Sequence, residues 1–144
     1  MKRFWYMAST YTVHPGGHEA AFQDAAKGAA MLVDAGVHIF SPIAHSHPIS
    51  EHMAPEKNNH DTWLDQDDPL MDAAFGIIIL GMPNWEKSKG IAYEREVFAG
   101  RTEIIAEWPL TKSNAECIAL LCKAVEAAAD KHIKTDGFYE VGTE

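Results

Sequence analysis

The chain has 144 residues, of which 47% are hydrophobic, and it carries a formal net charge of −9. This length suits one domain, residues 1–144, with a buried core and no Pro-, Gly- or Ser-rich linker. The acidic balance and the lack of a basic cluster exclude a duplex nucleic-acid surface. No run approaches membrane-spanning length, and polar residues from Ser9 onward interrupt the N-terminal segment before a signal-peptide core forms. We therefore expect a soluble cytoplasmic protein that is not bound to membranes.

The first half of the chain predicts two strands around a helix. An aromatic-rich run at residues 4–9 predicts the first strand, and a loop rich in hydroxyls and glycines follows it at residues 9–17. Such a loop can bring backbone N–H groups close to an anion. Residues 18–35 have a helical pattern that Gly36 ends, and residues 37–40 predict the second strand.

A histidine-bearing segment follows, which we predict to be a loop from residue 43 to about residue 59. Loops of this length inside compact domains are often functional lids. Imidazoles and carboxylates from this region could surround a Zn²⁺ ion: His45, His47, His52, His60, Asp61 and Asp65. Because no HExxH motif or cysteine partner fixes a geometry, we expect a lid without a metal.

Five acids lie in residues 60–75, just before the next strand. Asp68 and Pro69 resemble a helix start, with Asp68 as the N-cap and Pro69 at the first helical position. This interpretation leaves Asp67 in the preceding loop, where it can point into a site. Asp68 and Asp72 remain alternatives to Asp67, and a solvated acidic helix start would explain any of the three.

The run at residues 77–80 is a short β-branched stretch that predicts a central parallel strand buried on both faces. Ser88 is a predicted N-cap for the helix that follows. On that helix Glu94 lies at helical spacing from Ile91 and Phe98, which places a carboxylate in the middle of the apolar face. Glu94 is either a half-solvated acid near the helix start or a catalytic carboxylate.

The remaining chain predicts one more strand and one more helix. Residues 101–106 read as another parallel strand, and Ser113-Asn114 is expected to cap a long helix with an apolar stripe from Ile118 to Ala128. Cys117 and Cys122 are expected to be buried thiols in a reducing compartment. We expect residues 135–144 to be a frayed end or a dimer contact. The order of elements predicts a doubly wound parallel sheet, flavodoxin-like or Rossmann-like, in one three-layer domain.

The pattern Ser88-x-Gly90-x-x-x-Glu94 after a hydrophobic strand resembles the nucleoside 2-deoxyribosyltransferase superfamily, including its branch that hydrolyses deoxynucleoside 5′-monophosphates. Four stretches look closer still to an uncharacterised bacterial and phage subfamily of that fold: YMASTYT, FSPIAHSHPI, the segment from Trp63 to Asp67, and PNWEKSKGIAYE. The resemblance covers about residues 6–105.

The resemblance implies roles for individual residues. The Ser of the motif, Ser88, would bind a phosphate, and Glu94 would attack the anomeric carbon. An Asp at about the position of Asp67 would contact the sugar hydroxyls or act as a general acid to the base. The remaining implied contacts are a phosphate position at Ser9, a sugar or base pocket at Tyr6 or Tyr11, and a lid that places His45 and His47 against the substrate.

Two carboxylates suit cleavage of an N-glycosidic bond, with no cofactor required. We therefore expect hydrolysis of a nucleoside 5′-monophosphate that releases the free base. The alternatives are a nucleoside 2-deoxyribosyltransferase and a non-catalytic nucleotide-binding protein of the same fold. A phosphate-binding Ser88 favours the hydrolase, because transferases that accept free nucleosides do not need it. The expected partners are a small nucleotide or nucleoside and further copies of the chain, in a homodimer or higher homo-oligomer.

Overall fold

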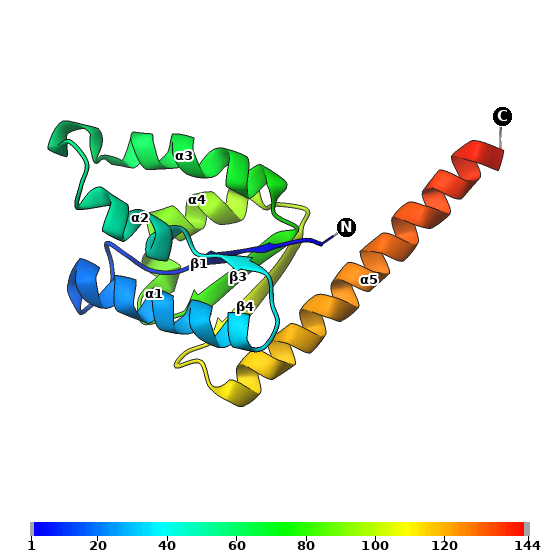
Figure 1. Cartoon of the computed structure of the whole chain (residues 1–144), viewed down its shortest axis with the longest axis horizontal. Helices are drawn as coiled ribbons and strands as arrows, with labels where there is room; N and C mark the ends of the chain where they lie inside the picture. The colour runs from blue at the N-terminus through cyan, green and yellow to red at the C-terminus, as the bar shows by residue number, and fades with distance from the viewer. Residues whose placement is uncertain (1, 143–144) are drawn as a thin grey trace.

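Four parallel strands form the sheet in the computed structural model, which describes residues 2–142 and the side chains of residues 2–131 (Figure 1). The strands are β1 (Trp5–Ala8), β2 (Ile39–Phe40), β3 (Gly76–Gly81) and β4 (Thr102–Glu107). Their order across the sheet is β2-β1-β3-β4, and every pairing is parallel. The predicted fold class is thus confirmed.

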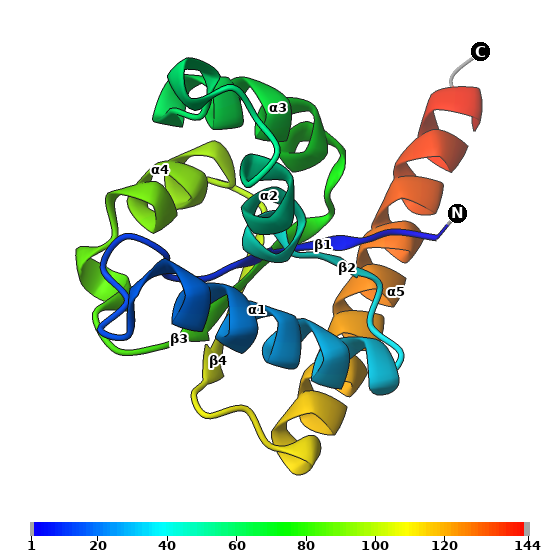
Figure 2. The ribbon, with the colours of Figure 1, turned by 60° about the vertical axis from the view of Figure 1, so that its left-hand side comes forward.

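Five α-helices flank the sheet: α1 (Gly17–Asp34), α2 (Pro42–Ser50), α3 (His60–Ala73), α4 (Lys89–Val97) and α5 (Lys112–Gly142). Helices α1 and α5 cover one face, where Met7, Ile78 and Ile104 from three strands form part of the core. Helices α3 and α4 cover the other face, where Ala8, Ile77 and Ile79 belong to a second core cluster. Helices on both faces make the domain three-layered (Figures 1 and 2).

The central strand β3 is a buried apolar run, as its sequence predicts, and Ile77, Ile78 and Ile79 have no exposed surface. It begins with a glycine for a steric reason. A Cβ atom at Gly76 would lie 2.5 Å from the carbonyl oxygen of Thr102 and 2.7 Å from the indole of Trp5. Only glycine lets the three strands approach this closely at their amino-terminal ends.

From β1 the chain passes through α1 to β2 on one side, and then crosses back to β3 on the other side of β1. The strand order therefore changes direction between β1 and β3. In open parallel sheets, ligands bind outside the carboxyl ends of the strands at such a switch point. Ser9 follows the end of β1, and Met82 follows the end of β3. The fold therefore indicates a ligand site at the carboxyl ends of β1 and β3.

The predicted histidine-bearing loop is largely helical, so that prediction is wrong. Residues 42–50 form α2, with the Ser41 hydroxyl accepting from the backbone N–H of Ala44 at 3.2 Å. Ser41-Pro42 is typical of a strand end, but Pro42 lies in the first turn of α2, where a proline is well tolerated. Only the connection between α2 and α3 remains irregular, apart from a single 3₁₀ turn at Pro55–Lys57.

Helix α3 begins at His60, nine residues before its predicted first residue, Pro69. Asn59 is its N-cap, and the Asn59 side chain accepts a hydrogen bond from the N–H of Thr62 at 3.0 Å. Pro69 therefore lies inside the helix rather than at its first position. Asp67 consequently lies on α3 and not in a loop before it.

The final helix also differs from its prediction. It begins at Lys112 after Thr111, whose hydroxyl accepts from the N–H of Asn114 at 3.2 Å, so Ser113 and Asn114 are not its cap. Cys122 is buried, but Cys117 is exposed, which contradicts its predicted place in the core. Leu121 is 48% exposed and does not belong to the buried stripe.

The predicted irregular tail is helical as far as Gly142, and residues 143–144 lie outside the described part of the chain. Within residues 2–142, no helix combines the length and the apolar character that crossing a membrane requires.

Candidate active site

Helix α4 presents Glu94 toward the interior. Its predicted N-cap is confirmed, because the Ser88 hydroxyl accepts a hydrogen bond from the N–H of Ile91 at 3.2 Å. Ile91 and Phe98 are 1% and 2% exposed, so they mark the buried face of the helix. Glu94 lies between them on this face, at spacings of three and four residues. The cap and the apolar spacing together fix the direction in which the carboxylate points.

The Glu94 carboxylate has an unusual environment for an acid. Its Oε2 atom is buried and has no hydrogen-bond partner among the described residues. Burial raises the pKa of Glu94 to about 8, against a hydrogen bond from Tyr6 that lowers it, and the nearby Asp67 raises it further. A carboxylate whose buried oxygen lacks a hydrogen bond destabilises a fold, so its presence here points to a function.

Asp67 provides the second carboxylate. It is half-buried on α3, and its Oδ1 atom also lacks a hydrogen-bond partner among the described residues. Burial raises the pKa of Asp67 to about 6, while His45 lowers it and Asp68 raises it. The two alternatives, Asp68 and Asp72, are both exposed. Of the three candidates, Asp67 is the one whose charge acts on Glu94.

Tyr6 is the third side chain of the site, and it makes a hydrogen bond with Glu94. It is central in β1 and 1% exposed, and its pKa is raised by burial, then by the charges of Glu94 and Asp67. Its ring packs between Phe40, at 6.1 Å between centroids, and Phe98, at 5.5 Å. Tyr6 thus lies between two aromatic rings and within range of the charges of both acids.

This pairing has a direct electrostatic consequence. Burial is the main cause of both raised pKa values, and the charge of Asp67 adds to the cost of ionising Glu94. Near neutral pH one group of such a pair is charged and the other holds a proton. The arrangement can therefore supply an anion and a proton donor within one site.

The two histidines predicted to line the site point in different directions. His45 is exposed, packs against Phe40 at 5.3 Å between ring centroids, and acts on Asp67 through its charge. His47 faces α1 instead, where its ring stacks on Phe22 at 4.6 Å. Because both residues lie on a helix, a separation of two residues rotates their side chains by about 200°. His47 therefore does not join the carboxylates, contrary to the prediction.

The loop after β1 contributes Ser9, the third residue with an unpaired buried atom. Ser9 is 5% exposed, and its Oγ atom has no hydrogen-bond partner among the described residues. Tyr11 belongs with His47, because its hydroxyl lies 2.8 Å from His47 Nδ1 and its ring stacks on His18. Of the two tyrosines considered for the site, only Tyr6 lies beside the carboxylates.

Ser88 and Gly90 lie at the start of α4, six and four residues before Glu94. A Cβ atom at Gly90 would lie 3.7 Å from the Ser88 hydroxyl, an ordinary contact, so packing within the chain does not require glycine there. The free N–H groups of the first helical turn and the Ser88 hydroxyl are donors suited to an anion.

Sequence reasoning missed two aromatic residues of the site, Phe40 and Phe98. Phe98 carried a usable signal, since it lies four residues after Glu94 on the same helix face. Phe40 carried none, because its position depends on how β2 pairs with β1: Tyr6 and Phe40 are register partners. Aromatic contacts across strands follow from pairing rather than from sequence spacing.

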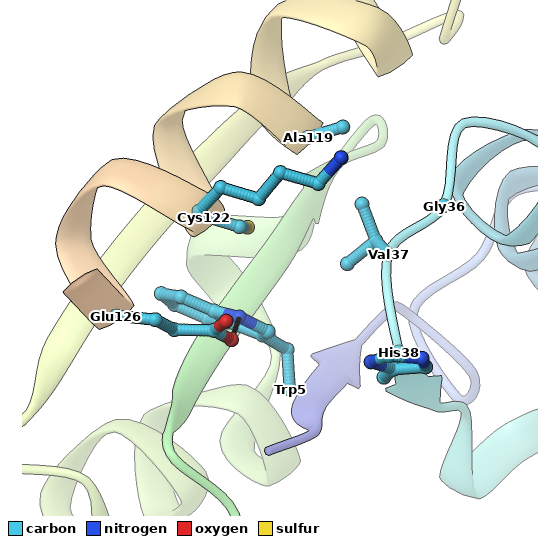
Figure 3. A pocket seen from close by; sticks show the side chains of 8 residues that line it. Trp5, Gly36, Val37, His38, Ala119, Cys122 and Glu126 are labelled. Carbon is cyan, nitrogen blue, oxygen red and sulfur yellow. Dashed lines mark hydrogen bonds between the residues drawn. The ribbon is translucent and has the colours of Figure 1, made fainter. Parts of the chain in front are cut away.

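A cavity of about 90 Å³ lies elsewhere, between α5 and the segment that enters β2 (Figure 3). Trp5, Val37, His38 and Cys122 line it, and the Trp5 indole N–H donates to Glu126 at 2.8 Å. Trp5 starts β1 and His38 precedes β2, so this cavity is at the amino-terminal edge of the sheet. It is therefore separate from the candidate site at the opposite edge.

One protein family matches most of the chain. A family described as Domain of unknown function (DUF1937) matches residues 3–110. The chain belongs to this family. Comparison with curated proteins gave no match. Tyr6, Asp67 and Glu94 all lie within the span of this DUF1937 domain, whereas α5 lies beyond it.

Proposed function

We propose that this DUF1937 protein hydrolyses the N-glycosidic bond of a nucleoside or deoxynucleoside 5′-monophosphate and releases the free base. The observation that carries the proposal is the pair Glu94 and Asp67, two acids with raised pKa values and unpaired buried oxygens, of which Glu94 accepts a hydrogen bond from Tyr6. The resemblance of the Ser88-to-Glu94 motif to the nucleoside 2-deoxyribosyltransferase superfamily supports the same chemistry.

In the proposed reaction, ionised Glu94 attacks the anomeric carbon of the sugar. The bond from that carbon to the base nitrogen breaks, and its electron pair leaves with the base, which takes up a proton. Water then cleaves the ester between Glu94 and the sugar, so the products are free base and sugar 5-phosphate. Asp67 either holds a sugar hydroxyl or supplies the proton to the departing base.

The phosphate is proposed to bind at the start of α4. Ser88 accepts a hydrogen bond from the N–H of Ile91, so its own hydroxyl proton is free to be donated to a phosphate oxygen. The partial positive charge at the helix N-terminus favours the same anion. Ser9 is proposed as a further donor, because its buried hydroxyl has no partner among the described residues.

Substrate access would require movement near the two carboxylates, whose unpaired oxygens are covered. The connection from α2 to α3 is the segment suited to moving, because almost every residue from 51 to 61 is exposed. Exposed segments with few buried contacts open at low free-energy cost. We therefore keep the lid role for this connection, which follows α2 and its residue His45.

The transferase and the non-catalytic nucleotide-binding protein are the two alternatives to the hydrolase. The same carboxylate pair would serve a nucleoside 2-deoxyribosyltransferase, in which a second base replaces water. A pKa of Glu94 raised to about 8 means that most Glu94 is protonated at neutral pH, which suits a protein that binds nucleotides without cleaving them. The donors at the start of α4 favour the phosphate-dependent hydrolase over the transferase.

A substrate panel tests the proposal. The protein is incubated with nucleoside and deoxynucleoside 5′-monophosphates, and with the matching nucleosides, with and without a second free base. Chromatography then measures the released base. Release from a monophosphate in water alone is the expected result. Base exchange that requires a free nucleoside and an acceptor base would support the transferase, and binding without any release would support the non-catalytic protein.

We further propose that the protein is cytoplasmic and forms a homo-oligomer. Both cysteines are free, and unpaired thiols are typical of a reducing compartment. Exposed leucines on α5 support the association of copies of the chain.

A further inference from the structure

A second cluster of polar groups lies between α1 and α2, apart from the two carboxylates of the proposed reaction. His47 Nε2 lies 2.9 Å from Glu19 Oε2 and 3.6 Å from Glu51 Oε1. One donor atom from each of the three residues falls within 4.8 Å of the other two. Glu19 is in the first turn of α1, whereas His47 is on α2 and Glu51 is its C-cap. Two helices therefore bring one nitrogen and two carboxylates to a single point.

The His47 ring is held in place before any ligand binds. Its side chain is 10% exposed, it stacks on Phe22 with an interplanar angle of 20°, and Tyr11 packs edge-on against it. The Tyr11 hydroxyl lies 2.8 Å from Nδ1, which leaves Nε2 as the ring nitrogen that faces the two carboxylates. A metal-binding histidine usually donates its second N–H to an oxygen in this way, which fixes the tautomer.

We propose that Glu19, His47 and Glu51 bind a divalent metal ion of the zinc type. His47 and Glu51 are four residues apart and so share one side of α2, a spacing that zinc-binding helices use. Ligand bonds of about 2.0–2.2 Å in a tetrahedron place neighbouring donor atoms about 3.3–3.6 Å apart. The distance from His47 to Glu51 is within this range, and the exposed Glu19 side chain would move away from His47 by a few tenths of an ångström. The imidazole ligand favours zinc over magnesium or calcium, which prefer oxygen ligands alone.

Metal binding would move the single His47 ring proton from Nε2 to Nδ1. Without the metal, a proton on Nε2 makes the contact with Glu19; with the metal, Nε2 offers its lone pair and Nδ1 donates to the Tyr11 oxygen. The Glu19 and Glu51 side chains are 67% and 62% exposed, so the ion has open access from solvent. The bound ion would tie α1 to α2. This inference does not depend on the proposed reaction, and it departs from the sequence analysis, which weighed other acids and expected no metal.

Zinc titration tests the site in full-length protein that carries no affinity tag and has been treated with a chelator. Calorimetry is expected to show one zinc ion per chain, and thermal unfolding is expected to shift to higher temperature with zinc. Glu19→Gln and Glu51→Gln should each weaken zinc binding by about tenfold or more, because each removes one charged ligand. These variants keep His47, whose buried ring is needed for packing.

His52→Ala is the matched control, because His52 is an exposed histidine close to the cluster in sequence. It should leave zinc binding unchanged. Cobalt(II) adds an independent reading, since a visible absorption band that is lost in Glu51→Gln would report coordination at this place. The proposal is overturned if zinc does not saturate a single site, or if Glu19→Gln and Glu51→Gln bind zinc as tightly as the unaltered protein.

Discussion

At the residue scale, the main feature of this protein is an acid that the fold holds at a cost. Burial favours the uncharged form of Glu94, and the nearby Asp67 adds to the effect. A carboxamide would fill the same space without a charge, so stability alone gives no reason for an acid there. Sites that hold such groups commonly use them in proton transfer or nucleophilic attack.

The pH dependence of folding should reveal this cost. The pKa of Glu94 is about 8 in the folded chain and near its ordinary value of 4.5 when unfolded, so the folded state binds more protons between these values. The free energy of unfolding should therefore fall as pH rises through this window. Glu94→Gln removes the charge, so its stability relative to the unaltered protein should rise between pH 5 and pH 8, by roughly 1–3 kcal/mol.

Urea unfolding at the two pH values measures this difference. Glu96→Gln is the matched control, because Glu96 is two residues away on α4 and exposed. It should leave the pH dependence unchanged. Equal pH dependence in Glu94→Gln and the unaltered protein would show that Glu94 is not held in its protonated form.

The pH dependence of turnover tests the roles of the two acids. If Glu94 attacks as an anion while Asp67 holds a sugar hydroxyl as an anion, kcat/KM should rise through about pH 6 and again to about pH 8. The substrate phosphate also has a second pKa of about 6, so either group could cause the rise of kcat/KM near pH 6. Asp67→Asn separates the two, because only the rise that comes from Asp67 should disappear in this variant. A decline of kcat/KM above pH 8 would contradict these roles, because it would require one of the two groups to act as a protonated acid.

At the scale of single elements, the sequence was informative where local chemistry decides the structure. Ser88 was predicted as the N-cap of α4, and its hydroxyl makes that bond. The apolar run of β3 and the helix end at Gly36, with φ of 92°, also follow from local preferences. The site residues Asp67 and His47 depended instead on α2 and α3, where Pro42 predicted the end of a strand and Pro69 predicted a helix start. There tertiary packing overrides a local signal, and helices replace the predicted loop.

Removing the cap hydroxyl tests the phosphate position. Ser88→Ala should weaken nucleotide binding by roughly 1–2 kcal/mol, as for a lost hydrogen bond to a charged group. It should also lower stability by about 1 kcal/mol through loss of the cap. Calorimetric titration with a nucleoside monophosphate measures the first effect, and urea unfolding measures the second.

Thr111→Ala is a matched control for the loss of a cap. Thr111 makes the same kind of bond at the start of α5, again at 3.2 Å. It should lower stability by a similar amount and leave nucleotide affinity unchanged. If Ser88→Ala loses stability but binds the nucleotide as tightly as Thr111→Ala does, Ser88 has only a structural role.

At the scale of the whole molecule, the parallel sheet could be predicted because alternating strands and helices have few permitted arrangements. The central site could be predicted only in part. The sequence predicts that Glu94 and Asp67 lie close together. It does not decide between Tyr6 and Tyr11, because the place of Tyr6 beside the two acids depends on how β1 packs against α4. The proposed metal-binding cluster could not be predicted from the sequence, because Glu19 and His47 come together only where α1 contacts α2.

The surface of α5 predicts that copies of the chain associate. Leu120 and Leu121 are 69% and 48% exposed, and Cys117 and Ala124 are exposed at helical spacing on the same side. An exposed apolar stripe of this kind is typical of an interface. Light scattering should show a dimer or higher oligomer, and replacing both leucines by Lys should give a monomer.

Val33→Lys is the control for this experiment, because Val33 is an exposed apolar residue on α1 instead. It should leave the mass of the assembly unchanged. An unaltered protein that is monomeric at micromolar concentrations would contradict the prediction.

The central claim is that Glu94 carries out the cleavage, and base release by Glu94→Gln tests it most directly. Glu96→Gln serves as the control, because residues two apart on α4 face about 200° away from one another. With a nucleoside monophosphate that the unaltered protein cleaves, Glu94→Gln should still bind the nucleotide but release no base, and Glu96→Gln should release it at a near-normal rate. Near-normal base release by Glu94→Gln would contradict the proposed mechanism.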